Sequence, residues 1–348
     1  MKTIDRNEGV GKPPTPFRTV QIHPTRRCNL ACKHCYSSSS PALNTMLDIA
    51  ALKTFLGYAY KKGFNNIAVS GGEPFLYDKL EELLMYTHSL GYQNTIASNG
   101  MLLQSERNQR ILEHVDLIAI SIDGLPDLHD HIRGQKGAYN KMMKGVETLN
   151  KLQKPFGFIH TVTPQSWESL IQLGQIAYEN GACLFQLHPL EMYGRAVEEL
   201  SASSVNDTLA HRIFILADYL RSKYDKKMSI QLDLLHKDYL REFPEVVNVF
   251  EAETESCLSL DTIIVDEMGE IYPAPYGLDT WFRIGNVHSF SEFMFEQFAI
   301  EKMPVIKTMY NELINKILGN EKMDILNWSE LLVDESRYTA EAMTGIRS

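Results

Sequence analysis

The sequence predicts an α/β protein with a mostly parallel sheet and a smaller C-terminal region. Two observations indicate this fold. Short apolar runs typical of strands alternate with amphipathic helical segments from residue 17 to about 190, which makes six strand–helix units. The chain has 348 residues, of which 44% are hydrophobic, and it is too long for one ordinary compact domain unless that domain is a barrel. We therefore expect a barrel followed by a smaller C-terminal part.

The position of each element follows from the spacing of the apolar residues. After a first strand that ends at Ile22, the segment 48–62 carries Ile49, Leu52 and Leu56 at helical intervals. The expected strands are 17–22, 66–70, 93–98, 117–122, 156–162 and 183–188, and the further helices lie near 77–90, 104–114, 139–152 and 166–180. In a parallel barrel, ligands gather at the C-terminal ends of the strands, so the residues directly after each strand are the candidate site.

Three cysteines follow the first strand. Cys28, Cys32 and Cys35 lie within eight residues, and three thiolates on one loop can hold a four-iron cluster while one iron keeps no protein ligand. Structural zinc normally takes four ligands, usually from two separated pairs, and no second pair follows. A zinc site completed by His23 or His34, or three unrelated core thiols, is the alternative.

The second strand is followed by Gly71, Gly72, Glu73 and Pro74. The two glycines lack side chains and let the backbone approach a ligand closely, and Glu73 adds a carboxylate at the same edge of the sheet. The alternative is an ordinary turn, since these residue types are common in turns.

The third and fourth strands also end in short polar residues. Ser98 and Asn99 close the third strand, and Ser121 and Asp123 close the fourth. Hydroxyl, amide and carboxylate groups at this edge offer the donors and acceptors that a ribose needs. Turn chemistry is the alternative, because Asn-Gly and Asp-Gly pairs favour positive φ.

Together these motifs resemble those of the radical S-adenosylmethionine (SAM) enzymes, whose signature is Cys-x3-Cys-x2-Cys. The resemblance implies an open partial (β/α)6 TIM-like barrel, one [4Fe-4S] cluster on the three cysteines, and SAM chelating the open iron. Reductive cleavage of SAM then gives a 5′-deoxyadenosyl radical that abstracts a substrate hydrogen. It also implies that His34 lies near the adenine and that Gly71 to Pro74 bind the methionine amino group. Ser98, Asn99, Ser121 and Asp123 match positions that often contact SAM.

Two arginines are further candidates for the cofactor site. Arg133 ends a stretch, Asp127 to Gly134, that resembles one common in the peptide-modifying branch of the family. Its planar guanidinium could bind the methionine carboxylate with two hydrogen bonds, or it could cap a surface loop. Arg195, after the sixth strand, is expected to bind SAM, to bind substrate or to cap a helix.

The C-terminal part resembles the SPASM or twitch extension, which holds auxiliary iron–sulfur clusters. A strand-like hairpin covers 263–273, but Ala274 and Pro275 stand where the extension has a cysteine, and no cysteine follows Cys257. We therefore predict one cluster per chain and a remnant of the extension without its metal. Cys257 is a candidate hydrogen donor to a substrate radical, or a buried structural thiol. The expected divisions are a flexible segment 1–16, the barrel 17–200, a helical linker region 201–256, and the hairpin with C-terminal helices 257–348.

Enzymes with this extension mostly modify peptides, so the resemblance implies a ribosomally made precursor peptide as substrate and epimerisation, backbone excision or cross-linking as the reaction. Only about 16 residues precede the first strand, so a separate recognition protein is expected to deliver the peptide. An electron donor such as flavodoxin or ferredoxin is also expected. The alternatives are radical SAM chemistry on a small molecule or in cofactor biosynthesis, and a non-catalytic iron–sulfur or zinc protein.

The charge and composition of the chain restrict the classes of substrate, partner and compartment that we expect. A net charge of −10 argues against a surface that follows nucleic-acid phosphates and favours a cationic or neutral substrate. The polar N-terminal segment 1–17 has no apolar stretch for a signal peptide or a membrane span. Five cysteines, an odd number, do not form a disulfide framework, and an oxygen-sensitive cluster belongs in a reducing compartment, so we expect a cytoplasmic protein.

Overall fold

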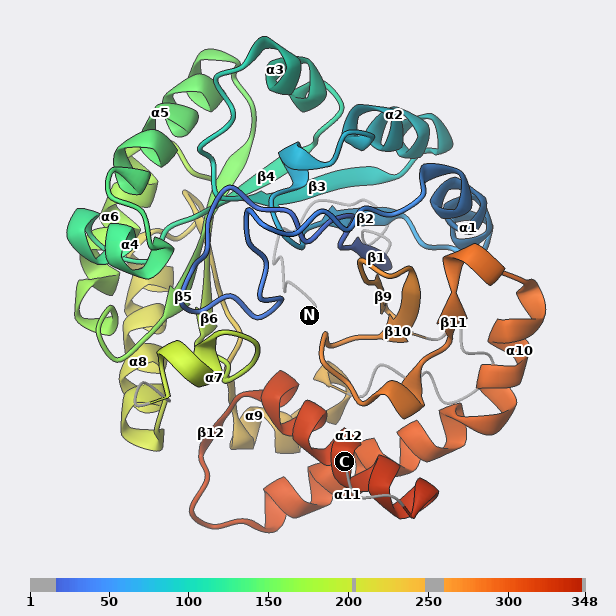
Figure 1. Cartoon of the computed structure of the whole chain (residues 1–348). Coiled ribbons are helices and arrows are strands. Elements are labelled where there is room, and N and C mark those ends of the chain that lie inside the picture. Colours follow the sequence, from blue (N-terminus) through green and yellow to red (C-terminus); the bar gives the residue numbers. More distant parts are fainter. Residues whose placement is uncertain (1–16, 202–204, 248–259, 346–348) are drawn as a thin grey trace, which may run out of the picture.

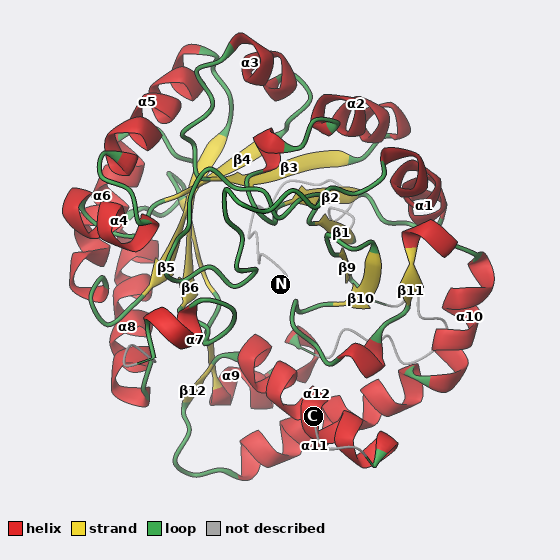
Figure 2. Cartoon of the chain, in the orientation of Figure 1, coloured by secondary structure: helices red, strands yellow, loops and turns green. Residues whose placement is uncertain are grey.

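The computed structural model describes residues 17–201, 205–247 and 260–345. Its centre is a curved sheet with helices around the outside (Figures 1 and 2). The strands of this sheet run in the order β11-β10-β9-β1-β2-β3-β4-β5-β6-β7. They are β1 (Thr19–Ile22), β2 (Asn66–Val69), β3 (Gln93–Ser98), β4 (Leu117–Ser121), β5 (Phe156–Val162), β6 (Leu184–Pro189), β7 (Ser229–Leu232), β9 (Thr262–Val265), β10 (Glu270–Pro273) and β11 (Gly285–Asn286).

The six expected strands are β1 to β6, each parallel to its neighbour, and the expectation of an α/β partial barrel is confirmed. The helices expected between these strands also lie where apolar spacing predicts them.

The helices of the described residues are α1 (Ile49–Lys61), α2 (Leu80–Leu90), α3 (Glu106–Leu112), α4 (Pro126–Arg133), α5 (Ala138–Lys151), α6 (Leu170–Glu179), α7 (Ala196–Glu199), α8 (Asp207–Lys223), α9 (Lys237–Glu242), α10 (Glu292–Glu301), α11 (Met303–Gly319) and α12 (Trp328–Thr344).

The structure differs from the expectation in two regions. The stretch from 201 to about 250 is not helical throughout, because β7 follows α8 and extends the parallel sheet beyond β6. Its buried Ile230 and Leu232 alternate with half-buried Gln231, which is the period of a strand. The second difference is α4, which begins with Pro126 in its first turn and ends before Gly134 in the left-handed conformation.

The C-terminal hairpin is part of the main sheet. Strand β9 pairs in parallel with β1, with Val20 opposite Ile263, and β10 pairs antiparallel to β9. A separate two-stranded sheet joins β8 (Leu235–His236) to β12 (Ile325–Leu326). The sheet therefore runs on into the region that resembles the extension, and it places the hairpin beside the loop that follows β1.

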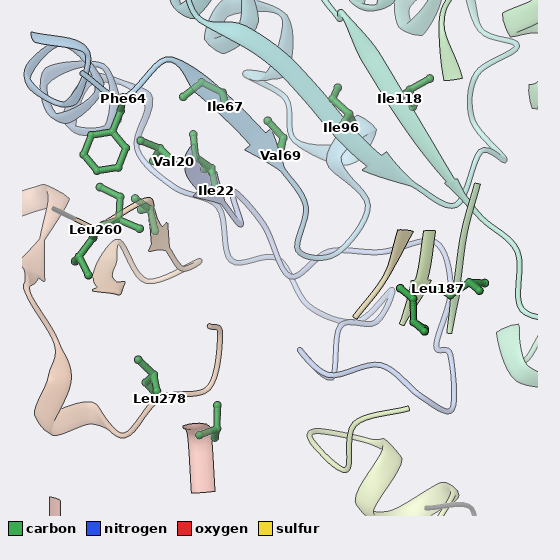
Figure 3. Close-up of a cluster of buried hydrophobic side chains, with 14 of the residues drawn as sticks. Val20, Ile22, Phe64, Ile67, Val69, Ile96, Ile118, Leu187, Leu260 and Leu278 are labelled. Atoms are coloured by element: carbon green, nitrogen blue, oxygen red, sulfur yellow. The ribbon is translucent and has the colours of Figure 1, made fainter. Parts of the chain in front are cut away.

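The core lies between the sheet and the surrounding helices. Val20, Ile22, Ile67 and Val69 point from neighbouring strands into one buried apolar cluster, some of whose side chains are drawn in Figure 3. Burial of such side chains stabilises the fold by about 1.5–3 kcal/mol each. Within the described residues, no helix combines the length and apolarity needed to cross a bilayer.

If β9 belongs to this core, replacing Ile263 with alanine should lower the free energy of unfolding by about 2–4 kcal/mol, because the side chain is fully buried. Urea titration of the wild-type and variant proteins measures the difference. Ile300→Ala is the matched control, since Ile300 is 77% exposed and its loss should change stability by less than about 0.5 kcal/mol. Equal effects of the two substitutions would contradict the parallel pairing of β9 with β1.

Candidate active site

The cysteine loop is the irregular segment from His23 to Asp48 that joins β1 to α1 across the C-terminal strand ends (Figure 1). Two isolated bridges close it, Thr25 with Met46 and Arg27 with Ser40. Backbone hydrogen bonds within the segment, such as that from the Cys28 amide to the Ser40 carbonyl, are supplemented by backbone partners from other parts of the chain.

The three cysteines lie together on this loop. Cys28 and Cys32 are buried and pack with Leu30, while Cys35 is partly exposed. The sulfur of Cys35 accepts a hydrogen bond from the Ser39 amide at 3.3 Å. Burial, reinforced by the charge of a nearby carboxylate, raises the pKa of Cys28 to about 12, so binding of a metal centre must displace a proton from this thiol.

Among the described residues, no three His, Cys, Asp or Glu side chains converge closely enough to hold a single metal ion. A four-iron cluster makes a different demand, because each thiolate binds a different iron and the sulfurs stand farther apart than ligands of one ion. Three neighbouring thiols with backbone and guanidinium donors around their sulfurs fit such a cluster. The donor set therefore favours the cluster over zinc.

The two glycines after β2 pack against the backbone of the cysteine loop. The amide of Gly72 donates to the Thr25 carbonyl at 2.8 Å, and the amide of Glu73 donates to the Arg27 carbonyl at 2.9 Å. A side chain at position 72 would collide with the Arg27 carbonyl, and Gly71 has a φ of +99°. Both positions therefore require glycine, and Pro74 then opens a short 3-10 turn.

Glu73, Ser98 and Asn99 meet in one buried hydrogen-bond group. The Glu73 carboxylate accepts from the Ser98 hydroxyl at 2.9 Å, the Asn99 amide at 3.0 Å and the Phe75 amide at 3.3 Å. Burial raises the pKa of Glu73 to about 6, although these donors oppose the shift. The Asn99 side chain also donates to Asn29 on the cysteine loop at 2.8 Å. This group ties the ends of β2 and β3 to the loop.

Asp123 is the centre of a buried ionic group. One of its carboxylate oxygens lies 3.0 Å from His34 Nε2 and 2.5 Å from Arg133 Nε, and its amide donates to His129 Nδ1 at 3.1 Å. Burial alone would raise the pKa of Asp123, but the charges of Arg133 and His34 hold it well below its usual range. The other carboxylate oxygen, Oδ1, is buried and has no hydrogen-bond partner among the described residues.

Arg133 links this ionic group to the cysteines, because its Nη1 lies 3.5 Å from the sulfur of Cys32. It is therefore buried against the candidate cluster and is not a surface cap. Ser121 is half-buried at the end of β4 and does not join the group.

Arg195 holds the cysteine loop by its backbone. Its guanidinium donates to the carbonyls of Cys32 at 2.6 Å and Ser39 at 2.7 Å, and its amide donates to the Cys35 carbonyl at 3.0 Å. Gly194 precedes it with a φ of +55°, where a side chain would collide with the carbonyls of Cys35 and Tyr36. Contact of Arg195 with SAM or substrate stays a prediction.

Cys257 lies outside the described residues, so its suggested role as a hydrogen donor stays a prediction. A second set of polar side chains, not predicted from the sequence, lies at the strand ends. His188, at the end of β6, forms an ion pair with Asp233, which follows β7, and His160 on β5 is buried between the Ile122 carbonyl and Ser166. The sequence signal for them is a polar residue at a strand end, and for Asp233 this signal depends on β7, which lies in the stretch expected to be helical.

Comparisons with known proteins agree with this geometry. Residues 22–175 match the family model of the Radical SAM superfamily, and the chain contains a radical SAM domain. The family uses a [4Fe-4S] cluster and SAM. The cysteine triad and the groups around Glu73 and Asp123 lie inside the matched segment, whereas His188, Arg195 and Asp233 lie beyond its end.

The names of two curated relatives indicate different substrates. The AdoMet-dependent heme synthase of Methanosarcina barkeri is 28% identical over 278 residues, which cover 74% of this chain and 77% of that protein. The sporulation killing factor maturation protein SkfB of Bacillus subtilis is 26% identical over 222 residues, or 63% of this chain and 53% of that protein. The match thus spans about half the length of SkfB.

A structure of anSMEcpe with bound AdoMet has the same fold, with a TM-score of 0.63 at 17% identity over 94% of both chains. The same protein with bound AdoMet and the Cp18Cys peptide gives a TM-score of 0.59 at 17% identity, over 87% of this chain and 84% of that chain. At this level of identity the likeness shows the fold alone.

Gly194→Ala should loosen the cysteine loop, because the new methyl group would collide with the carbonyls of Cys35 and Tyr36. We expect it to lower the free energy of unfolding by about 2 kcal/mol more than the control does, and to lower the iron retained after anaerobic reconstitution. The control is Gly345→Ala, since Gly345 also has a positive φ, of +70°, but has nothing within 4 Å of an added methyl group. Iron analysis and urea titration measure both effects, and equal results for the two variants would exclude the steric role of Gly194.

His160 should make stability depend on pH. Burial lowers its pKa from 6.5 to about 4, so the folded state holds the neutral ring. Stability from this residue is complete above pH 6.5 and is lost as the pH falls toward 4, by about 2 kcal/mol between pH 7.5 and pH 5. Urea titrations at the two pH values measure the decrease in the free energy of unfolding. In His160→Gln this decrease should be smaller by the contribution of His160. The control His288→Gln changes an exposed ring, so this variant should lose as much stability between the two pH values as the wild type does.

Proposed function

We propose that the protein is a radical SAM enzyme that modifies a ribosomally made precursor peptide. The cluster on Cys28, Cys32 and Cys35, with SAM on its open iron, would supply a 5′-deoxyadenosyl radical that removes a hydrogen atom from the peptide.

The strand-end groups would bind and orient SAM. Ser98 and Asn99 fix the carboxylate of Glu73, and Glu73 holds the turn of Gly71 and Gly72 against the cysteine loop. In this position the backbone of the turn would bind the methionine group of SAM. Asp123 keeps its charge beside Arg133 and has one buried oxygen without a hydrogen-bond partner among the described residues, which suits a ribose hydroxyl. His34 is held by the same carboxylate, which would fix its ring beside the adenine.

The observation that supports a peptide substrate is a group of acidic side chains at the ends of β6 and β7. Asp233 and Glu191 stand there with His188, and Glu330 of α12 lies close enough to Glu191 to interact electrostatically with it. Burial raises the pKa of both glutamates, as expected for crowded carboxylates. Three acids beside one histidine repel an anionic ligand and accept a neutral or cationic one.

A peptide backbone with neutral or basic side chains meets this charge pattern, whereas a tetrapyrrole carries several carboxylates. SkfB supports the peptide by its role in maturation of a killing factor. The absence of any cysteine after Cys257 favours a redox-neutral outcome such as epimerisation, backbone rearrangement or excision, because no ligand set for a second cluster is evident.

The second candidate is radical SAM chemistry on a small molecule or in cofactor biosynthesis. The heme synthase of M. barkeri favours it, since its match with this chain is longer than that with SkfB. Under either proposal, a flavodoxin or ferredoxin would donate the electron. A separate recognition protein that presents the peptide belongs to the first candidate only.

Anaerobically reconstituted protein should form 5′-deoxyadenosine from SAM only when a reductant is present. Cys35→Ala should abolish this product by removing one cluster ligand, while Cys183→Ala should keep it because Cys183 lies outside the triad. Chromatography with mass detection measures the product. A wild-type protein that binds only zinc, or never cleaves SAM, would be the non-catalytic metal protein instead.

The substrate class is tested separately with two probes. A short peptide encoded beside the gene, co-expressed with the enzyme, should change in mass or stereochemistry, and it should do so only with the intact cysteine triad. Iron coproporphyrin should show no saturable change in absorbance with the protein, because the acidic strand ends repel its carboxylates. Tight porphyrin binding with an unmodified peptide would favour the second candidate.

A further inference from the structure

The C-terminal hairpin touches the cysteine loop through an aromatic contact. Tyr276, which follows β10 and the Ala274-Pro275 pair, packs on His23 with ring centroids 4.9 Å apart and on Tyr36 at 5.1 Å. His23 and Tyr36 are themselves 5.7 Å apart, so the three rings form one cluster. This aromatic cluster joins the hairpin to the first residue after β1 and to the residue directly after Cys35.

Tyr36 connects the cluster of rings to the turn after β2. Its hydroxyl lies 3.2 Å from the Ser70 hydroxyl and 3.4 Å from His23 Nε2. Ser70 immediately precedes Gly71, whose backbone is also within hydrogen-bonding reach of the Tyr36 hydroxyl. A shift of the Tyr36 ring would therefore move both the backbone at Cys35 and the turn proposed to bind SAM.

A second contact from the same hairpin reaches the loop from the turn between β9 and β10. Glu267, only 9% exposed, pairs with Arg26 through Oε1 and Nε at 3.4 Å. Arg26 in turn donates to the Ser37 carbonyl at 2.9 Å, two residues after Cys35. Both contacts thus act on the segment that carries the third cysteine.

We infer that Tyr276 and Glu267 are positioning residues for the cluster and for SAM. In this chain the hairpin that resembles an auxiliary-cluster scaffold holds the cysteine loop by side-chain contacts. Parallel pairing of β9 with β1 fixes the base of the hairpin, and the ring of Tyr276 and the carboxylate of Glu267 fix its two ends against the loop. The effect is on the geometry at Cys35 and Gly71, and neither residue touches the reacting atoms. This inference rests on the family's cluster and SAM, and it does not depend on which substrate is modified.

The test titrates SAM into the dithionite-reduced, reconstituted protein and follows the change in the electron paramagnetic resonance spectrum of the cluster. Tyr276→Ala should keep about four irons per chain but bind SAM about tenfold more weakly, because two ring contacts are lost. Tyr276→Phe should behave as wild type, since it keeps the ring. Tyr338→Ala, which removes a tyrosine that is 65% exposed, is the matched control and should also behave as wild type.

Glu267→Gln provides an independent variant that leaves the rings in place. It should weaken SAM binding about threefold by removing the charge that holds Arg26. A wild-type SAM titration and spectrum in Tyr276→Ala would overturn the inference. If Tyr276→Ala does not take up the cluster, Glu267→Gln decides: weaker SAM binding supports the inference and wild-type binding overturns it. Failure of all variants and the wild type to bind SAM would instead refute the proposed function.

Discussion

The structure depends on holding one irregular loop in place. The segment after β1 must present three thiols to one centre, and its own backbone hydrogen bonds lie in turns and isolated bridges. Several of its carbonyls also accept hydrogen bonds from elsewhere: from the amides of Gly72 and Glu73 after β2, and from Arg195 after β6. Each partner stands at the C-terminal end of a parallel strand, so the sheet supplies the geometry that the loop lacks.

The same constraint explains why so many charged groups are buried here. Taking Asp123 and Arg133 out of water carries a large desolvation penalty, and replacing a buried ion pair with apolar residues often leaves a protein equally stable. Stability therefore does not account for the pair. The pair is explained by its position, because Asp123 also contacts His34 on the cysteine loop and Arg133 reaches the sulfur of Cys32. The fold alone leaves the substrate open.

Much of this arrangement could be predicted from the sequence. Periodic apolar residues located β1 to β6, and the strict spacing of the cysteines and the Gly-Gly-Glu-Pro turn marked the candidate site, because these signals are local. Contacts between distant segments could not be predicted. Nothing near Arg195 indicates that its partners are the carbonyls of Cys32 and Ser39, and nothing near Tyr276 indicates His23 and Tyr36. The pairing of β9 with β1 was missed for the same reason.

We expect the three cysteines to hold one four-iron cluster whose fourth iron is left for SAM. Mössbauer spectroscopy of the anaerobically reconstituted protein, with iron and sulfide analysis, measures this arrangement. It should show about four irons per chain in a single [4Fe-4S] cluster, one of which changes its spectrum when SAM is added. A spectrum that SAM leaves unchanged, or a second cluster of comparable size, would contradict it.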